Sequence, residues 1–480
     1  MTTQAISVGR DPRAIATLAG RWATRILGVA SLAGSVGLSL WLVLAATERR
    51  SILSGPAKHA GFAGWIVGPL AHHLPGLSSD PVRLRHDFLV VLIALLACWL
   101  VASLCVDRLH VAWIAGTLGL LGVVFLLSPP LSLTDLFNYL HYGRMGAVQG
   151  LNPYSVLPVH SPHDGWYALS NWHHLASPYG PLFTLVTYPL ALLPLHTAYW
   201  AWKVIVMLSE FGMLGLVWWL APQVGRSPQR ALAFVGLNPL VLVYGLGGAH
   251  NEPLVMLAVM AGVALTVRGA LPGTRRGWSA GAGVAIVGAA ALKLSMIVLA
   301  PLIVLGSERR RAAAAGAVVA GVATIATIGL VFGGHLPAIS LQERLTTPLS
   351  IPQFFGWLAG QGGQSALVRT ICHVVLGLAV AGACVAVLLR RSLLIAACGT
   401  VMLVAVLTLG WTMPWYILWV LPFAALARTR WLTAACIVLT LWLGLGAIPQ
   451  MPDIIHHFGY VPGHTAIGRA NHLLTERTVR

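Results

Sequence analysis

Residues 88–106 read FLVVLIALLACWLVASLCV, residues 107–109 read DRL, and residues 110–127 read HVAWIAGTLGLLGVVFLL. Each of the two apolar runs approaches the roughly 20 residues that an α-helix needs to span a bilayer. The Asp107–Arg108 pair between them marks a tight turn. Because the runs are continuous and do not alternate, they predict membrane helices and exclude an outer-membrane barrel.

The composition extends this prediction to the whole chain. Of its 480 residues, 57% are hydrophobic and 9% are charged, and the mean hydropathy is +0.80. A soluble surface needs far more charge. The net charge of +17 does not indicate a nucleic-acid partner, because the basic residues cluster between apolar runs, as the positive-inside rule predicts. We therefore expect an all-α polytopic integral membrane protein whose surroundings are the lipid bilayer.

The arginines orient the chain. The N-terminal segment, residues 1–23, carries several of them and is predicted to be cytoplasmic. A long apolar run near Thr24–Ala46 then acts as a signal anchor. Later arginine clusters mark further cytoplasmic loops. On this basis the membrane domain covers residues 24–448 with an outward segment at 131–179, and the C-terminal tail, residues 449–480, lies outside.

Two apolar stretches break this alternation. Residues 278–306 have basic groups at both ends, which predicts a re-entrant hairpin broken near Lys293. Residues 181–199 carry Pro189 and Pro194 and form a second broken segment. Non-helical backbone at membrane depth is tolerated only where it is buried in protein or lines a cavity. We expect about eleven full spans plus these two segments, with the N-terminus inside and the C-terminus outside.

Asp135 is one of only 13 acidic residues and follows an apolar run, so it is predicted to lie at the outward mouth of a span. A membrane-embedded enzyme could keep its base at such a place. Asp135 fits a helix cap equally well. Tyr139, Tyr142 and Met145 follow at helical spacing and predict an amphipathic helix on the membrane surface, ended by the Gly150–Tyr154 stretch.

Other polar groups are predicted at the same outward ends. They are the turn 177–181, Ala249–His250–Asn251–Glu252, Gln342–Glu343–Arg344, Lys293 and the run 410–416. Together they predict an outward-facing cavity roofed by residues 131–179. Lys293, deep in an apolar run, indicates a functional site because buried charges in membranes are costly. Lys203 and Glu210 are interpreted as a structural ion pair.

This set of residues suits the transfer of a sugar from a lipid phosphate. An acceptor hydroxyl needs a base, and a leaving phosphate needs cationic groups, for which Lys293, His250 and Arg344 are candidates. Trp411 and Trp415 offer aromatic faces to a sugar. The histidines 163, 173 and 174 match no established ligand spacing. No cofactor is therefore expected, although a divalent metal is left open.

Several short motifs resemble one known family. In chain order they are Asp135 with Tyr139 and Gly143, Gly150–Tyr154, Ser177–Leu182, Leu237–Leu240, Gly248–Glu252, Leu292–Lys293 and Pro414–Tyr416. Their order resembles the GT-C superfamily of glycosyltransferases that use polyprenyl-phosphate sugars. The resemblance is greatest to the actinobacterial polyprenyl-phosphomannose α-1,6-mannosyltransferases of lipomannan synthesis, enzymes of cell-envelope biosynthesis.

The resemblance implies a GT-C fold, Asp135 as the general base of an inverting transfer, and an active site on the outer face of the plasma membrane. It implies a polyprenyl-phosphate hexose, mannose in the relatives, as donor and a lipid-linked glycan as acceptor. The predicted substrate-binding residues are Tyr139, Asn152, Tyr154, Tyr179, Asn251, Glu252, Trp411, Trp415 and Tyr416.

Two departures leave the sugar and the acceptor open. Glu252 stands where the family pattern has Asp, and Asn138 stands where a second acidic residue is common. A secondary transporter or a flippase of lipid-linked sugars is the alternative function, since broken helices and a buried lysine suit it as well. Against it, the chain shows no internal repeat, which many transporters have.

Overall fold

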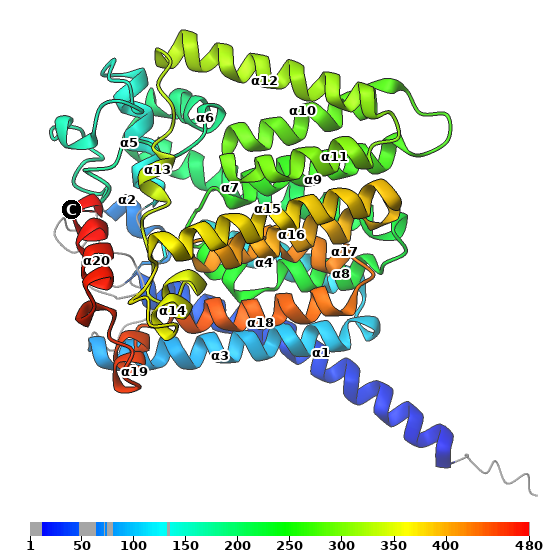
Figure 1. Cartoon of the computed structure of the whole chain (residues 1–480). Helices are drawn as coiled ribbons and strands as arrows, with labels where there is room; N and C mark the ends of the chain where they lie inside the picture. The colour runs from blue at the N-terminus through cyan, green and yellow to red at the C-terminus, as the bar shows by residue number, and fades with distance from the viewer. Residues whose placement is uncertain (1–11, 48–63, 72, 74–79, 132–134, 480) are drawn as a thin grey trace, which may run out of the picture.

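The computed structural model describes residues 12–47, 64–71, 73, 80–131 and 135–479. In these ranges the chain forms helices and no strands, packed lengthwise into one bundle (Figure 1). Eight helices are long and apolar enough to cross a membrane. They are α1 (Pro12–Ala46), α3 (Pro81–Cys105), α7 (Leu195–Gln223), α9 (Glu252–Gly269), α12 (Arg310–Phe332), α15 (Ala366–Leu389), α16 (Leu394–Thr408) and α18 (Arg430–Ala447). This confirms the all-α polytopic membrane protein, whereas the count of eleven full spans stays a prediction.

Shorter helices complete the bundle, and several continue one another across a bend. They are α4 (Val111–Leu126), α6 (Pro181–Ala191), α8 (Pro228–Gly236) with the π-helical η3 (Val241–Leu246), α10 (Arg276–Leu292), η4 (Leu294–Leu299) with α11 (Ala300–Gly306), and η6 (Pro414–Trp419) with α17 (Leu421–Leu426). One end of the bundle, at the left of Figure 1, carries α2 (Gly64–Val67), α5 (Asp135–Ala147), α13 (Ile339–Gln342), α14 (Ile351–Leu358), α19 (Met451–His457) and α20 (Ala466–Val479). Single 3-10 turns are η1 (Val106–Arg108), η2 (Pro158–His160), η5 (Arg391–Leu393) and η7 (Pro462–His464).

The opposite end of the bundle collects arginines that tie loops together. The contacts are Arg230 with Asp107, Arg428 with the Val224 carbonyl, Arg309 with the Thr274 carbonyl, and Arg391 with Glu308. Each contact joins loops that are far apart in sequence. The predicted cytoplasmic loops therefore share one end, away from α5 and α20 (Figure 1).

The predicted break at Lys293 exists. Lys293 has extended backbone, with φ −147° and ψ 111°, between α10 and η4. The hydrogen bond from Arg309 to Thr274, 2.8 Å long, brings the two ends of the hairpin together. The 17 residues of α10 extend about 25 Å, close to the thickness of a hydrocarbon core. The hairpin is therefore deeper than the re-entrant loop that we expected, and Lys293 lies at its tip.

The second predicted break falls between α6 and α7. The helix α6 ends at Ala191, and Pro194 is the residue that precedes the first turn of α7. Pro189 lies within α6. Proline lacks a backbone N–H and clashes with the preceding turn, so the pair of prolines accounts for the interruption.

Two sequence expectations are wrong. The helix α5 forms and ends before Gly150, whose φ is 67°, but Tyr139, Tyr142 and Met145 are buried in the protein. It is thus a core helix and not a helix on the membrane surface, because α6 and α7 pack against it.

The second error is the ion pair between Lys203 and Glu210. Lys203 donates instead to the Ser128 carbonyl at the end of α4. Both Glu210 carboxylate oxygens are buried without a hydrogen-bond partner among the described residues. Seven residues separate the two side chains by about 10 Å along a helix, which is too far for contact.

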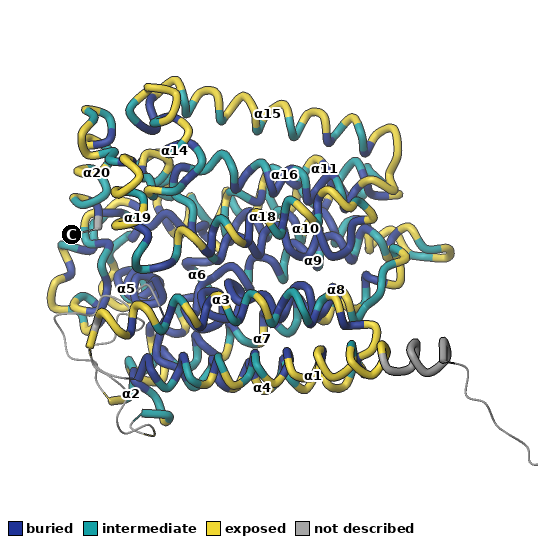
Figure 2. Tube along the Cα trace, turned by 90° about the horizontal axis from the view of Figure 1, so that it is seen from below, coloured by how far each residue is buried: buried dark blue, intermediate teal, exposed yellow. Residues whose placement is uncertain are grey.

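Burial follows the expected division between protein and lipid (Figure 2). Buried residues fill the interior, while α15 is exposed along most of its length. The exposed side chains of α12 and α15 are mainly aliphatic, such as Ile325, Leu330 and Leu378. In a soluble protein such a surface would aggregate, whereas against acyl chains it is stable.

Candidate active site

Asp135 is the first residue of α5, and only 12% of its side chain is exposed. Its Oδ2 lies 3.6 Å from Nε2 of His250. The His250 ring is fully buried and stacks on Trp415, with the ring centroids 3.4 Å apart. Three distant segments thus meet at the carboxylate that the sequence singled out.

His250 faces Asp135 as a neutral ring. Its Nδ1 lies 2.6 Å from the Tyr244 carbonyl, which can only accept, so we assign the hydrogen to Nδ1. The lone pair of Nε2 then points toward Asp135. Burial lowers the pKa of His250 to about 3, with a smaller contribution from the charge of Lys293, although the hydrogen bond to Tyr244 acts in the opposite direction. The assignment of His250 to the donor phosphate stays a prediction.

A tight turn holds His250 in place. A side chain on Gly248 would bring its Cβ within 2.4 Å of the Tyr244 carbonyl, so only glycine fits. Ala249 has a φ of 51°, a left-handed conformation that costs free energy for a residue with a side chain. The indole of Trp202 donates to the Ala249 carbonyl at 2.8 Å and supports this conformation. Strained backbone of this kind concentrates at functional sites.

Lys293 and Glu252 form the charged pair of the site. The ammonium lies 2.5 Å from Oε1 of Glu252, while Oε2 has no hydrogen-bond partner in the described part of the chain. The ammonium also lies 4.5 Å from the ring centroid of Tyr416 and 5.1 Å from that of Trp419. Cation–π contacts and the carboxylate together compensate for burying this charge.

The turn 177–181 packs against the tip of the hairpin. The Gly180 N–H donates to the Leu292 carbonyl at 3.1 Å. A Cβ on Gly180 would lie 2.1 Å from the Ala291 carbonyl oxygen, so the contact requires glycine. This close approach fixes the position of Lys293, the next residue along the chain.

The environment of Asp135 alters its acidity. Burial, together with the charge of Glu252, raises the pKa of Asp135 to about 7. The charge of Lys293 and a hydrogen bond with Asn138 act in the opposite direction. A carboxyl with a pKa near neutrality is suited to take up a proton during catalysis.

Lys293 opens into a cavity of about 280 Å³, which we call the lysine cavity. Its polar lining comprises Lys293, Gln342, Glu343, Gln364, Arg369 and His373. Its apolar lining comes from η4, α15 and α16 and includes Leu294 and Ile297, both of which are also exposed on the outside of the bundle. The cavity therefore combines a cationic end with an apolar side.

The predicted substrate-binding residues fall into two groups. The first group lies with Asp135 and His250 and consists of Asn251, Glu252, Trp415 and Tyr416. In the adjoining aromatic cluster, the rings of Tyr139 and Tyr179 pack edge to face, with their centroids 4.9 Å apart. Trp411 lines the lysine cavity and contacts Trp172. The second group consists of Asn152, Tyr154 and Arg344, which the structure does not bring to Asp135.

The members of the second group have other contacts. Asn152 donates to the Phe332 carbonyl at 2.7 Å, and the Tyr154 hydroxyl donates to the Tyr179 carbonyl at 2.9 Å. Both side chains hold the outward segment against the bundle. Arg344 is exposed in the loop after α13 and does not line the lysine cavity. Its assignment to the donor phosphate stays a prediction.

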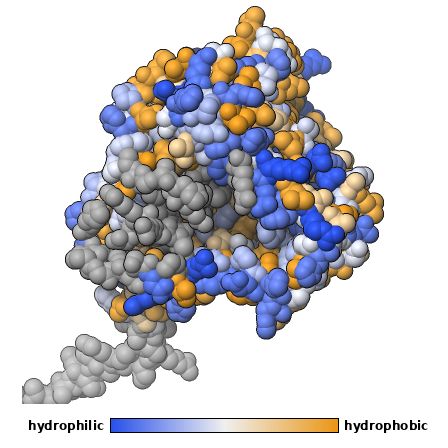
Figure 3. Space-filling view, turned by 90° about the vertical axis from the view of Figure 1, so that its left-hand side faces the viewer, coloured by the Kyte–Doolittle hydropathy of each residue, from blue (hydrophilic) through white to orange (hydrophobic). Residues whose placement is uncertain are grey.

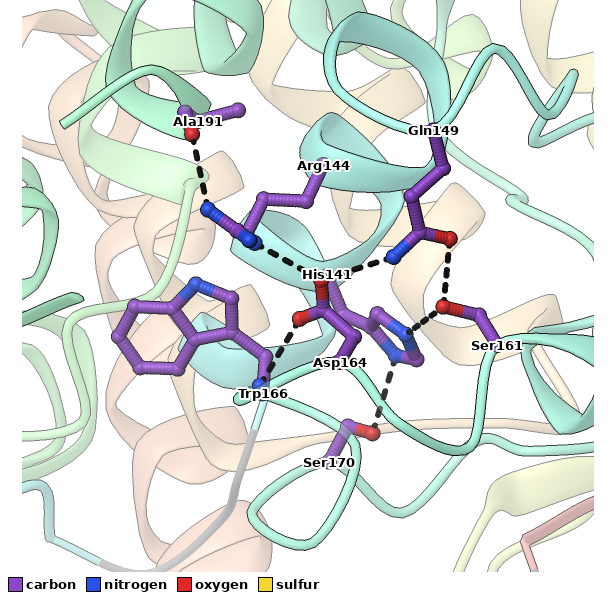
Figure 4. Close-up of polar contacts among 8 residues, drawn as sticks. All are labelled: His141, Arg144, Gln149, Ser161, Asp164, Trp166, Ser170 and Ala191. Carbon is purple, nitrogen blue, oxygen red and sulfur yellow. Dashed lines mark hydrogen bonds and ion pairs between the residues drawn. The ribbon is translucent and has the colours of Figure 1, made fainter. Parts of the chain in front are cut away.

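A polar network stabilises the outward segment over α5 (Figure 4). Arg144 donates to the Asp164 carboxylate at 2.8 Å, and Gln149 donates to the same oxygen. The Ser161 hydroxyl donates to Gln149 at 2.6 Å, and the His141 ring lies between the hydroxyls of Ser161 and Ser170. These contacts join residues 161–170 to the helix that begins at Asp135.

Comparison with known proteins identifies the family. Residues 62–309, just over half of the chain, match the family described as "Alpha-(1->6)-mannopyranosyltransferase, N-terminal domain". The chain belongs to this family. It is a mannosyltransferase of the GT-C type, as the motifs indicated.

Individual relatives agree with this assignment. Alpha-(1->6)-mannopyranosyltransferase A of Mycobacterium tuberculosis is 29% identical over 81% of this chain and 83% of its own length. A probable alpha-(1->6)-mannopyranosyltransferase of Mycolicibacterium smegmatis is 27% identical over 68% of each chain. No solved structure gives a significant match. The family decides between the two functions that the sequence left open, in favour of the glycosyltransferase and against the transporter.

The sequence did not reveal Arg369 and His373 as site residues of this mannosyltransferase. Both lie near the start of α15 and line the lysine cavity. Their spacing of four residues places them on one face of the helix, which was the available signal. It was obscured because α15 otherwise resembles an ordinary apolar span.

The histidines considered as metal ligands have local contacts. His173 bonds to the Tyr167 carbonyl at 3.0 Å and stacks on the Tyr167 ring. In the described ranges, no three His, Cys, Asp or Glu side chains gather as metal ligands would. The expectation that no metal takes part stays a prediction.

Proposed function

We propose that this mannosyltransferase moves mannose from a polyprenyl phosphate to a lipid-linked glycan on the outer face of the plasma membrane. The observation that carries the proposal is the buried Asp135, facing the neutral His250 and lying beside the Lys293–Glu252 pair. By likeness to the relatives, the linkage formed is α-1,6. A β-linked donor would give it by inversion.

The reaction follows from these groups. Asp135, when ionised, takes the proton of the acceptor hydroxyl. The acceptor oxygen forms a bond to the anomeric carbon, and the bond from that carbon to the phosphate oxygen breaks. The electron pair leaves with the polyprenyl phosphate, whose charge Lys293 and Arg369 in the lysine cavity stabilise. Asp135, now protonated, lies 3.6 Å from Nε2 of His250 until the proton is released.

The lysine cavity supports a lipid phosphate as donor. Its cationic end suits the phosphate, and its apolar side, between η4 and α15, suits a polyprenyl chain. Leu294 and Ile297 continue this apolar side to the lipid-facing surface. A tail of many isoprene units can therefore leave the cavity sideways into the bilayer.

The outward orientation is supported by the arginine-rich loops. They gather at the end opposite α5, and such loops stay in the cytoplasm. The end that carries α5 and α20 then faces outward. Figure 3 views this end, where hydrophilic residues gather around a hollow.

The test is sugar transfer by purified enzyme. Radiolabelled polyprenyl-phosphate mannose and a membrane glycolipid extract serve as donor and acceptor. We expect Asp135→Asn to lose about 10²–10⁴-fold of the activity, while Asp453→Asn, an exposed carboxylate on α19, keeps it. Near-full transfer by Asp135→Asn would refute the assignment of Asp135 as the general base. If the enzyme transferred sugar only from a donor that carries another sugar, mannose would be refuted as the sugar transferred.

A further inference from the structure

A groove runs beneath the C-terminal helices α19 and α20. It consists of an inner cavity of about 290 Å³ and an outer cavity of about 490 Å³. Thr347, Pro348, Pro452 and Ile455 line both cavities, so the two are continuous. We call them together the C-terminal groove. It is separate from the lysine cavity, although Trp411 borders both.

The inner end of the groove reaches the catalytic carboxylate through two aromatic rings. Trp415 lines the inner cavity and stacks on His250, whose Nε2 faces Asp135. The next residue, Tyr416, lines the lysine cavity. The segment 411–416 therefore contributes to the walls of both cavities.

The two cavities differ in charge. The lining of the lysine cavity carries two cationic residues, Lys293 and Arg369, and one acidic residue, Glu343. By contrast, no Lys, Arg, Asp or Glu is among the described residues that line the C-terminal groove. Within a mainly apolar lining, the groove offers an indole ring and imidazoles, from Trp411, His456 and His472. Flat apolar surfaces with a few hydrogen-bonding groups suit a neutral ligand, and a glycan is such a ligand.

The outer wall of the groove is fastened to the bundle. The Tyr460 hydroxyl donates to the Pro348 carbonyl at 2.5 Å, and the Thr465 hydroxyl donates to the Gly362 carbonyl at 2.6 Å. On α20, Asn471 donates to the Gln353 side chain at 3.2 Å. These three contacts, spread over residues 460–471, hold this part of the chain over the groove.

We propose that the C-terminal groove binds the acceptor glycan and holds the sugars that precede the reacting one. This proposal rests on the proposed function and extends it to the acceptor. The two substrates then enter from different sides, the lipid phosphate through the lysine cavity and the neutral glycan beneath α19 and α20. Because the outer cavity contacts only the distant sugars, it favours acceptors of more than one sugar.

The kinetic test uses two acceptors, an octyl α-mannoside and an octyl glycoside of four α-1,6-linked mannoses. His456 lines the outer cavity, whereas the neighbouring and equally exposed His457 lines neither cavity. We expect His456→Trp to lower kcat/KM for the long acceptor at least tenfold relative to the short one. His457→Trp leaves the ratio unchanged. An unchanged ratio in His456→Trp, or an equal change in both variants, would overturn the proposal.

A second measurement separates this proposal from the proposed function. A four-mannose glycoside that carries a diazirine is photolysed with the Asp135→Asn enzyme, and the labelled peptides are identified by mass spectrometry. Label on residues 451–475 supports the groove even if the wild type transfers no mannose, in which case the proposed function alone fails. Label confined to α15 or η4, or no label above that given by a glucose-based probe, would overturn the groove.

Discussion

Asp135 can act as a base only when it is ionised, and its surroundings oppose ionisation. Burial, with the charge of Glu252, raises its pKa to about 7. The protonated form therefore dominates below that pH, so kcat/KM should rise with pH to a plateau, with a midpoint near 7, and fall about tenfold per unit below it. Initial rates at saturating donor, measured from pH 5 to 9, check this. A midpoint near the ordinary carboxyl value would contradict it.

Two variants should move that midpoint in opposite directions. Glu252→Gln removes a negative charge that raises the pKa of Asp135, so the midpoint should fall. Lys293→Met removes a positive charge that lowers this pKa, so the midpoint should rise. Asp453→Asn, remote from these charges, is the control. Shifts of the same sign in both variants would show that the pH dependence of kcat/KM arises from another titrating group.

Arg369 should act on the donor and not on the acceptor. It lines the lysine cavity with Lys293, away from the C-terminal groove. Losing a charged contact to phosphate costs roughly 1.5–3 kcal/mol, so we expect Arg369→Gln to raise the donor KM about tenfold or more and to leave the acceptor KM unchanged. Arg390→Gln, at the other end of α15, is the matched control. An equal increase in both KM values would instead indicate misfolding.

At the scale of elements, the turn 177–181 can pack closely against the helix α10 only because Gly180 has no side chain. A Cβ there would lie 2.1 Å from a backbone oxygen, which cannot move as a flexible side chain does. Gly180→Ala should therefore lower the free energy of unfolding by about 1–3 kcal/mol and displace Lys293. Gly288→Ala, on α10 with open space around it, should not destabilise. Melting temperatures in detergent and transfer rates test the pair. Equal stability of the two variants would contradict this account.

The elements themselves were predictable because apolar runs of bilayer length have few alternatives. The break at Lys293 was also predictable, since basic groups at both ends of the run require the chain to return to the side from which it entered, and a charge inside such a run needs a partner. That partner, Glu252, lies 41 residues away and could be found only once the helices were packed. The supposed partner of Lys203 was wrong for the same reason. Local spacing suggested Glu210, whereas the fold supplied the Ser128 carbonyl.

At the scale of the whole molecule, the bundle has two unlike ends. Arginines join the loops of one end, and the site, α5 and the C-terminal helices occupy the other. This polarity agrees with the proposed function, in which the lipid donor lies in the bilayer and the glycan acceptor lies outside. The lysine cavity meets the lipid-facing side of α15, and the C-terminal groove lies beneath α19 and α20.

The polarity predicts which end a reagent outside the cell can reach. Phe458, after α19, is 80% exposed at the site end, and Arg275 is exposed at the arginine end. In a variant without the six native cysteines, a membrane-impermeant maleimide added to intact cells should label Phe458→Cys and not Arg275→Cys. Permeabilised cells should label both, which controls for reactivity. The reverse pattern in intact cells would place the site in the cytoplasm, where a polyprenyl-phosphate donor facing outward could not reach Asp135.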